Sequence, residues 1–326
     1  METTMSHPRP TLYDVIAARP HVYRHLAPTP LHHYPTLSAL VGAQVWVKHE
    51  NHQPVGAFKV RGGLTLAAGL SEEQRRAGLY TASTGNHGQS IAFAARAHGI
   101  RATIAVPHGA NPSKVAAMRG LGAEVIAHGV DFDEAREWIM EKARAEGGCF
   151  VGPADEPLIC GVGTYALEIL EDLPQVETII VPVGAGSGAC GTAIVAKSIN
   201  PAIQVIGAQS AQAPAMQLSW KSGRLVTAGM ETFAEGVATR VPFENTQRIM
   251  RDLLDDFVLV EDAAIRRAVV LMLEHTHNLV EGAGAIPLAA ALAMQERLAG
   301  KKLVLVVSGG NLSLEKLRAI LASPAG

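Results

Sequence analysis

Short apolar runs rich in β-branched residues alternate along the chain with longer amphipathic segments. The runs that we expect to be strands are residues 45–48, 79–81, 102–106, 124–126, 178–183, 204–208 and 303–307. Helical patterns lie between several of them, at residues 86–98, 112–121 and 132–146. Strands that alternate with helices of this length are typical of βαβ units, in which helices cover both faces of a parallel sheet. The pattern therefore predicts an α/β fold whose ligands bind at the carboxyl ends of the strands.

Proline and glycine interrupt this pattern at two places. The chain has 326 residues, which suggests about two domains at ~150 residues each. The interruptions lie at residues 51–56 and 152–157. We therefore expect a small domain of residues 53–152, inserted into a large domain made of residues 1–52 and 153–326.

Composition and charge exclude several classes of protein. Hydrophobic residues make up 48% of the chain and charged residues 18%, which is ample for a buried core. The formal net charge of −2 provides no basic field for nucleic acid or an anionic membrane. The N-terminus has no apolar signal-peptide region, and no apolar stretch approaches the ~18 residues that span a bilayer. The odd number of cysteines argues against a disulfide framework, so we expect a protein of the reducing cytoplasm.

The first candidate for chemistry is Lys59, which follows a glycine turn at Gly56 and lies where a helix is expected to begin. The positive end of a helix dipole and partial desolvation would lower the pKa of this amine. Such an amine acts as a nucleophile and base near neutral pH. Taken alone, the segment fits an ordinary surface lysine better.

A second candidate site follows the expected strand at residues 79–81. Ser83, Thr84, Gly85 and Asn86 come directly after it, and a helix is expected next. Small hydroxyls and free N–H groups at a helix N-terminus bind anions, here most suitably a carboxylate. An ordinary helix cap would need only one of these residues, so the cluster favours a functional interpretation.

A glycine-rich loop between a strand and a helix, VPVGAGSGACGT at residues 181–192, is the third candidate. Its backbone N–H groups could hold a phosphate, with the hydroxyl of Ser187 as a further donor. The letters GSGACG also fit the GxGxxG pattern, so a nicotinamide dinucleotide site is the competing interpretation. That site needs an acidic residue about 20 positions later, where the chain has Gln209. No GK[ST] follows, which excludes a Walker A loop.

The fourth candidate is the loop Ser308-Gly309-Gly310-Asn311, which follows the apolar run at residues 303–307. The 13 histidines form none of the common zinc-binding spacings. Together the four sites call for a cofactor with one phosphate, an amine-reactive carbonyl and a ring heteroatom. Pyridoxal 5′-phosphate (PLP) has these groups.

At this point the chain resembles the serine/threonine dehydratase and serine racemase family of fold-type II PLP enzymes. The resemblance covers nearly the whole chain from Thr29-Pro30-Leu31 onwards. It is carried by motifs in a shared order: KxExxQ at 48–53, GxFKxRG at 56–62, SxGNHG at 83–88, the loop at 184–188, TxAEG at 232–236, EGAG at 281–284 and SxGN at 308–311. The resemblance implies a fold like that of the tryptophan synthase β subunit. This fold has two doubly wound, mostly parallel α/β domains, with the cofactor in the cleft between them.

The resemblance also implies a role for each site residue. Lys59 would form the Schiff base with PLP, and Phe58 would pack near the ring. Asn86 would bind the 3′ oxygen of the ring, and Ser308 would face the pyridine nitrogen. The residues expected around the substrate are Ser83, Thr84, Asn86 and His87, of which Ser83 and Thr84 are expected to be catalytic together with Lys59. The phosphate would be held by Gly184, Ala185, Gly186, Ser187 and Gly188.

The activity implied by the resemblance is an α,β-elimination that converts a 3-hydroxy amino acid, L-threonine or L-serine in the first place, to a 2-oxo acid and ammonia. The neutral hydroxyl of Ser308 makes the ring a weaker electron sink than a carboxylate would, which favours loss of a β-substituent over transamination. The usual serine before Phe-Lys is Ala57 here, which leaves 3-phenylserine, 3-hydroxyaspartate and a hydroxyectoine-derived amino acid open as substrates. Racemases have a second serine where this chain has Thr84, so an amino-acid racemase is the alternative.

The resemblance further implies a homodimer that binds small molecules and neither nucleic acid nor a membrane. No metal is expected, because Gln209 and Ala215 stand where some relatives have two metal-binding carboxylates. The chain ends soon after the SxGN motif, so we expect no C-terminal regulatory domain. Outside enzymes, a non-catalytic metabolite-binding protein is the alternative, and it would not need Lys59.

Overall fold

The larger of two sheets has six strands, in the order β1-β2-β10-β7-β8-β9. The computed structural model of the protein describes residues 9–322. The strands of this sheet are β1 (Leu31–His33), β2 (Gln44–His49), β7 (Thr178–Pro182), β8 (Gln204–Ser210), β9 (Asp256–Val260) and β10 (Lys302–Val307). Only the pair of β1 and β2 is antiparallel; the other neighbouring strands are parallel.

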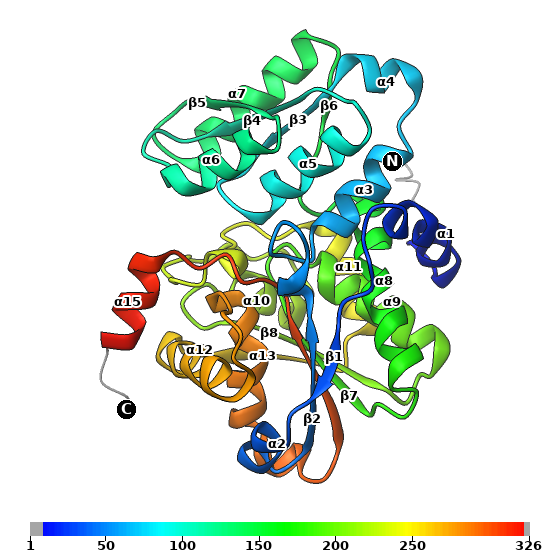
Figure 1. The fold of residues 1–326 in the computed structure, drawn as a ribbon, viewed down its shortest axis with the longest axis vertical. Coiled ribbons are helices and arrows are strands. Elements are labelled where there is room, and N and C mark those ends of the chain that lie inside the picture. The colour runs from blue at the N-terminus through cyan, green and yellow to red at the C-terminus, as the bar shows by residue number, and fades with distance from the viewer. Residues whose placement is uncertain (1–8, 323–326) are drawn as a thin grey trace.

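The smaller sheet has the strand order β5-β4-β3-β6, and its neighbouring strands are all parallel. Its strands are β3 (Leu79–Ala82), β4 (Ala102–Val106), β5 (Glu124–Ala127) and β6 (Cys149–Phe150). Helix α7 (Phe132–Ala145) packs on β3, β4 and β6. Helix α5 (Asn86–Ala97) packs on β3 and β4, and α6 (Pro112–Gly120) packs on β5. This sheet and its helices form the upper part of the molecule in Figure 1. They lie inside the segment 53–152, although the exact domain boundaries stay a prediction.

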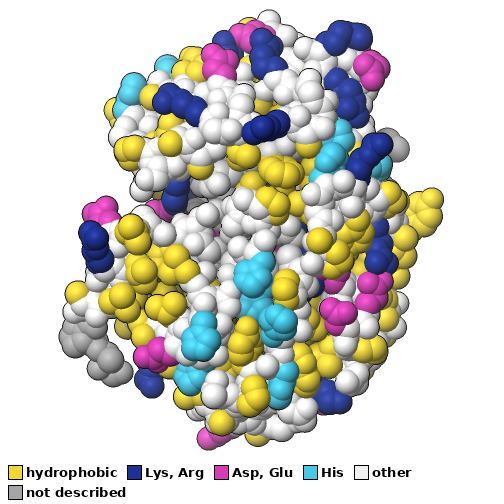
Figure 2. Space-filling model, in the orientation of Figure 1, with side chains coloured by type: hydrophobic (Ala, Val, Ile, Leu, Met, Phe, Trp, Pro, Cys, Tyr) yellow, Lys and Arg dark blue, Asp and Glu magenta, His cyan; other side chains and the backbone are white. Residues whose placement is uncertain are grey.

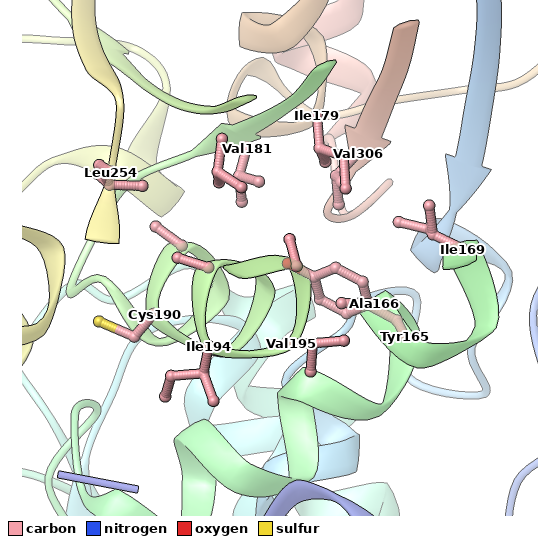
Figure 3. Packing of buried hydrophobic residues seen from close by; sticks show 14 of the residues in the cluster. Tyr165, Ala166, Ile169, Ile179, Val181, Cys190, Ile194, Val195, Leu254 and Val306 are labelled. Atoms are coloured by element: carbon pink, nitrogen blue, oxygen red, sulfur yellow. The ribbon is translucent and has the colours of Figure 1, made fainter. Parts of the chain in front are cut away.

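Helices cover both faces of the larger sheet, as the apolar strands predict. Neighbouring residues of β7 show this, because Ile179 packs into one core and Ile180 into the other. A strand whose two faces are both covered must be apolar at every position rather than at alternate ones. Figure 3 shows the first core, in which Ile179, Val181 and Val306 face the helices that carry Tyr165 and Ile194.

The helices of the first core are α1 (Leu12–Tyr23), α8 (Glu156–Asp172), α9 (Ser187–Ile199), α10 (Ala215–Ser222) and α11 (Glu244–Leu253). Those of the second core are α2 (Pro35–Val41), α12 (Asp262–Thr276), α13 (Gly282–Ala293), α14 (Gln295–Leu298) and α15 (Leu314–Ala322). The remaining elements are α3 (Val60–Ala68), α4 (Glu72–Ala77) and the 3₁₀ turns η1 (Glu50–His52) and η2 (Glu235–Val237). The α/β architecture with parallel sheets that the sequence predicts is confirmed.

Histidine side chains gather on the face that carries β1 and β2 (Figure 2), where the rings of His32, His49 and His52 lie next to one another. In the described part of the chain, residues 9–322, no helix has both the length and the apolarity that a bilayer crossing requires.

Candidate active site

Lys59 lies at the start of α3 and lines a cavity together with loops that are distant in the sequence. The residues that line this cavity are Phe58, Lys59, Pro182, Gly184, Ala185, Gly186, Ser187, Gly188, Gly236, Val237, Ala283 and Ser308. The structure therefore brings together the lysine, the glycine loop and the serine after β10. These elements meet because β2, β10 and β7 are parallel neighbours in the sheet, so the segments after them meet at one edge.

The backbone around Lys59 is held on both sides. The N–H of Phe58 donates to the carbonyl of Ser308 over 3.0 Å, and the hydroxyl of Ser90 donates to the carbonyl of Lys59 over 2.6 Å. The Lys59 Nζ lies 5.1 Å from the centre of the Phe58 ring. These contacts fix the amine at the cavity wall.

Burial lowers the pKa of Lys59 to about 8, although the nearby carboxylate of Glu281 opposes this shift. Lys59 keeps some exposed surface, but it lines the cavity. A cavity wall solvates an ammonium group poorly, so about a tenth of the amine is uncharged at pH 7, far more than for an ordinary lysine. The sequence predicts this reactive state at a helix start, and the position at the N-cap of α3 agrees with it.

The glycine loop is shaped by close backbone contacts. A Cβ atom on Gly184 would lie 2.3 Å from the carbonyl oxygen of Gly236, and Gly186 has a φ of 99°. The hydroxyl of Thr246 donates to the carbonyl of Ala185 over 2.8 Å, which supports the loop from α11. The loop leads into Ser187, the first residue of the 13-residue helix α9. Free N–H groups at a helix start bind anions, so this side of the cavity is suited to a phosphate.

The hydroxyl of Ser83 accepts two backbone hydrogen bonds and can still donate one. It accepts hydrogen bonds from the N–H groups of Gly85 over 3.2 Å and Gly88 over 2.9 Å. A hydroxyl oxygen has two lone pairs and one proton, so its proton remains available to an anion. Thr84, the next residue, lies partly exposed in the same loop.

His87 is buried and electrically neutral. Its Nε2 lies 3.3 Å from the carbonyl oxygen of Val151, and because a carbonyl only accepts, Nε2 carries the proton. Burial and the charge of Lys59 lower the pKa of His87 to about 3. The Nδ1 atom therefore keeps a lone pair and cannot donate to a carboxylate at neutral pH.

Asn86 contacts two residues to which the sequence assigned no role. Its Nδ2 donates to Oε1 of Glu281 over 2.7 Å, and its Oδ1 accepts from Nδ2 of Asn311 over 2.8 Å. Glu281 keeps some exposed surface, and desolvation raises the pKa of its carboxyl group. Glu281 belongs to the motif EGAG and Asn311 to the motif SxGN. The sequence therefore displays both residues, but it does not display the contacts between their motifs.

A second cavity adjoins the first and shares Gly236 and Ala283 with it. Its other lining residues are Asn111, Lys114, Phe233, Glu235, Glu281, Gly282, Asn311, Leu312, Ser313 and Lys316. Glu235 forms salt bridges with both Lys114 and Lys316 at this position. Asn86 therefore reaches the wall of the second cavity through Glu281 and Asn311.

Ala57, Gln209 and Ala215 depart from the motifs of the family that the chain resembles. Ala57 is fully buried and bridges to Gly309; it is not among the lining residues of either cavity in the described part of the chain. Gln209 is fully buried, with Nε2 donating to the carbonyl of Val237 and Oε1 accepting from the N–H of Gln217. Ala215 begins α10. Among residues 9–322, no group of three or more His, Cys, Asp or Glu residues is arranged to hold a metal ion.

Comparisons with known proteins give a consistent result. The family model described as pyridoxal-phosphate dependent enzyme matches residues 22–309. The L-threonine ammonia-lyase of Thermotoga maritima is 39% identical over 313 residues, which cover 95% of this chain and 78% of that protein. The catabolic L-threonine dehydratase of Escherichia coli is 35% identical and covers 94% of each chain. Among solved structures, maize serine racemase is similar with a TM-score of 0.90 and 32% identity, over 96% of this chain and 97% of that one.

Proposed function

The chain belongs to the pyridoxal-phosphate dependent enzyme family, and from this premise we propose that it is an ammonia-lyase that acts on L-threonine or L-serine. The expected products are a 2-oxo acid and ammonia, formed by α,β-elimination. The family, the fold-type II class and the dependence on PLP that the sequence predicts are confirmed. The observation that carries the proposal is the shared cavity of Lys59 and the glycine loop.

The residues around the cavity fit PLP. A Cβ atom at Gly184 would collide with the backbone of Gly236, so the loop needs glycine there to pack this closely. The loop lines the Lys59 cavity and leads into the start of α9, where free N–H groups suit a phosphate. Lys59 offers an amine whose pKa is lowered to about 8. Such an amine can react with the carbonyl of the cofactor near neutral pH.

We assign the individual residues as follows. Lys59 would bind the cofactor covalently, Phe58 would pack near its ring, and Asn86 and Ser308 would contact the 3′ oxygen and the pyridine nitrogen. The phosphate would be held by Gly184, Ala185, Gly186, Ser187 and Gly188. The lining of the cavity by the loop and by Ser308 supports these assignments.

When bound, PLP supplies a carbonyl that links to amines and a conjugated ring that accepts electrons from the substrate Cα. Lys59 Nζ would remove the proton from Cα and pass a proton to the departing β-hydroxyl. The hydroxyl of Ser83 would donate to the substrate carboxylate, since both of its lone pairs are used by Gly85 and Gly88. His87 would contribute through its main-chain N–H, because its ring Nε2 is bound to Val151.

A racemase is the second candidate, and Thr84 is the residue that favours it. A racemase needs an acid and base on the face of the substrate opposite to the lysine, and Thr84 keeps a hydroxyl next to Ser83. The similarity to maize serine racemase supports this alternative. The sequence leaves 3-phenylserine, 3-hydroxyaspartate and a hydroxyectoine-derived amino acid open through Ala57. Because Ala57 is fully buried and lines neither described cavity, its position adds no support for these substrates.

We also propose that the enzyme is a homodimer that works in the cytoplasm. The dimer rests on the resemblance to the family. The compartment rests on the free thiols of Cys149, Cys160 and Cys190, which a reducing environment preserves.

A substrate panel tests the proposal. The purified protein loaded with PLP is offered each 3-hydroxy amino acid in L and D form, and release of 2-oxo acid is measured together with the enantiomer ratio. We expect L-threonine or L-serine to give the highest kcat/KM for 2-oxo acid release. If no member of the panel releases 2-oxo acid while L- and D-serine interconvert, the lyase proposal is wrong and the racemase proposal holds.

A further inference from the structure

Asn311 holds the segment that leads to Lys59 and the side chain of Asn86 at the same time. Its Nδ2 donates to the carbonyl oxygen of Val55 over 2.8 Å and to Oδ1 of Asn86 over 2.8 Å. An amide nitrogen has two protons, so both donors of Asn311 are used. We propose that Asn311 is a positioning residue, which fixes the orientation of the Asn86 amide so that Asn86 presents a hydrogen-bond donor to the 3′ oxygen of PLP.

The backbone carbonyl of Val55 determines the orientation of both amides. A carbonyl can only accept, so the side of Asn311 that faces Val55 must be its nitrogen. The second proton of that nitrogen then requires an acceptor at Asn86, which places Asn86 Oδ1 toward Asn311. The Nδ2 of Asn86 consequently faces Glu281, to which it donates over 2.7 Å.

One N–H of Asn86 remains after these bonds are counted. Asn86 Nδ2 gives one proton to Glu281 Oε1 and keeps the other. The remaining N–H would point toward the amine of Lys59, because Glu281, which the same nitrogen contacts, lies close enough to Lys59 for its charge to act on the amine. A donor at this position stabilises an ionised 3′ oxygen, whereas an amide turned the other way would repel it.

Asn311 is itself held rigidly. The N–H of Gly310 donates to the carbonyl of Gly56 over 2.9 Å. Gly56 has a φ of 68°, and a Cβ atom there would lie 2.7 Å from Asn311 Oδ1. The amide of Asn311 is therefore packed flat against the turn that precedes Lys59. Because Asn86 begins α5 beside the smaller sheet, Asn311 also couples that part of the molecule to the cofactor lysine.

This inference rests on the proposed role of Asn86, and the absorption of bound PLP tests it. In Asn311→Asp, a side chain of nearly the same shape cannot donate to Val55 or to Asn86. Asn86 should then rotate and turn its oxygen toward the cofactor. We expect the long-wavelength band of the Lys59-linked cofactor to shift to shorter wavelength, because the ionised 3′ oxygen loses its donor. We expect PLP to bind roughly 10- to 100-fold more weakly, the effect of losing one hydrogen bond to a charged group.

A double-mutant cycle separates positioning from a merely structural role. Asn86→Ala should give the same spectral shift, and the pair Asn311→Asp with Asn86→Ala should bind PLP no more weakly than Asn86→Ala alone. Asn200→Asp is the matched control. Asn200 is exposed after α9, and its side-chain oxygen accepts from the N–H of Ala202 over 3.0 Å, a bond that aspartate keeps. Its spectrum and PLP affinity should equal those of the native protein.

The possible outcomes are distinguishable. Thermal unfolding of each apo variant, followed by circular dichroism, shows whether the chain still folds. An unshifted band in a folded Asn311→Asp protein would overturn the inference while leaving the proposed function intact. Additive losses of PLP affinity in the double variant would also overturn it. A native protein without any cofactor band would overturn the proposed function and this inference together.

Discussion

Arg61 Nε lies 2.7 Å from Glu50 Oε2, and neither side chain is exposed to solvent. Arg61 also donates to both oxygens of Glu168, over 2.6 and 3.0 Å, and Lys48 Nζ lies 2.5 Å from Glu168 Oε2. Two cations and two carboxylates thus neutralise one another inside the protein. Burial lowers the pKa of Arg61, but the carboxylates of Glu50 and Glu168 outweigh it and raise the pKa. The cluster joins β2, α3 and α8 only two residues from Lys59.

Replacement of Arg61 should strongly destabilise the protein. Arg61→Ala leaves Glu50 and Glu168 buried without their main partner, which typically costs about 3–5 kcal/mol. The free energy of unfolding of the apo protein, measured by urea denaturation, checks this. Arg19→Ala is the control, because its salt bridge with Glu171 is partly exposed and should contribute less than about 1 kcal/mol. Equal losses in the two variants would show that the buried cluster adds no special stability.

This cluster shows how far the sequence predicts the structure. Lys48, Glu50 and Arg61 stand in motifs that the sequence displays, but Glu168 lies 107 positions after Arg61, and no local pattern links them. The long apolar runs, such as the one that became β7, were predicted because a strand covered on both faces is apolar throughout. Three strands were not predicted. The edge strand β1 is short and polar and β6 has only two residues, so neither stands out. The edge strand β9 was also missed, although most of its residues are apolar.

In the candidate site, too, the motifs were predicted but the contacts between distant segments were not. The order of motifs identified Lys59, the glycine loop and Ser308, and the structure brings these into one cavity. No role was predicted for Glu281 or Asn311, because their importance comes from hydrogen bonds to Asn86 across separate motifs. Side-chain contacts between distant segments depend on the packing of whole elements, which a single sequence does not display.

The rate at which PLP attaches should depend on pH, with a midpoint near the pKa of Lys59. The uncharged amine is the reactive form, and its pKa is lowered to about 8, so the rate of cofactor attachment to apo protein should rise as pH increases through about 8. Stopped-flow absorbance over a pH series measures this. In Glu281→Gln the midpoint should move lower, because the negative charge of Glu281 raises the pKa of Lys59.

The same shift has a consequence for stability. In the unfolded chain Lys59 has its ordinary pKa of 10.5, whereas in the folded apo protein its pKa is about 8. The unfolded state therefore binds more protons between these values, so the Lys59 contribution to the free energy of unfolding should increase from pH 8 to 10.5. Lys59→Met should lack this increase and should not be labelled by PLP and borohydride. An attachment midpoint near 10.5 would contradict the prediction.

Gly186→Ala should weaken the binding of PLP much more than the binding of pyridoxal. Gly186 has a φ of 99°, and a Cβ atom there would lie 2.8 Å from Thr246 Cβ, so the loop must shift. Only a ligand with a phosphate uses this loop, and isothermal titration with both ligands separates the two effects.

The control is Gly223→Ala. Gly223 has a φ of 72°, but no atom lies within 4 Å of the added Cβ. This substitution should lower stability by about 1 kcal/mol and leave both affinities unchanged. Equal losses for PLP and pyridoxal in Gly186→Ala would argue against a phosphate site in the loop.

Glu235→Gln should raise KM more than it changes kcat. Glu235 bridges Lys114 of α6 and Lys316 of α15 beside the second cavity, so it ties the part with the smaller sheet to the part with the larger one. Although burial alone would raise its pKa, the two lysines lower it below its usual range, so the bridge is charged at neutral pH.

Glutamine removes that charge, and because Glu235 is half exposed we expect only a two- to fivefold rise in KM, the effect of roughly 1 kcal/mol. The amides of α6 should exchange faster with deuterium, since the smaller part opens more often. High salt should bring the native KM toward that of the variant, because partly exposed ion pairs are screened. Glu171→Gln, which breaks the pair with Arg19 away from the cavities, should leave KM and its salt dependence unchanged. If Glu235→Gln behaves like Glu171→Gln, the ion pairs of Glu235 with the two lysines do not contribute to substrate binding.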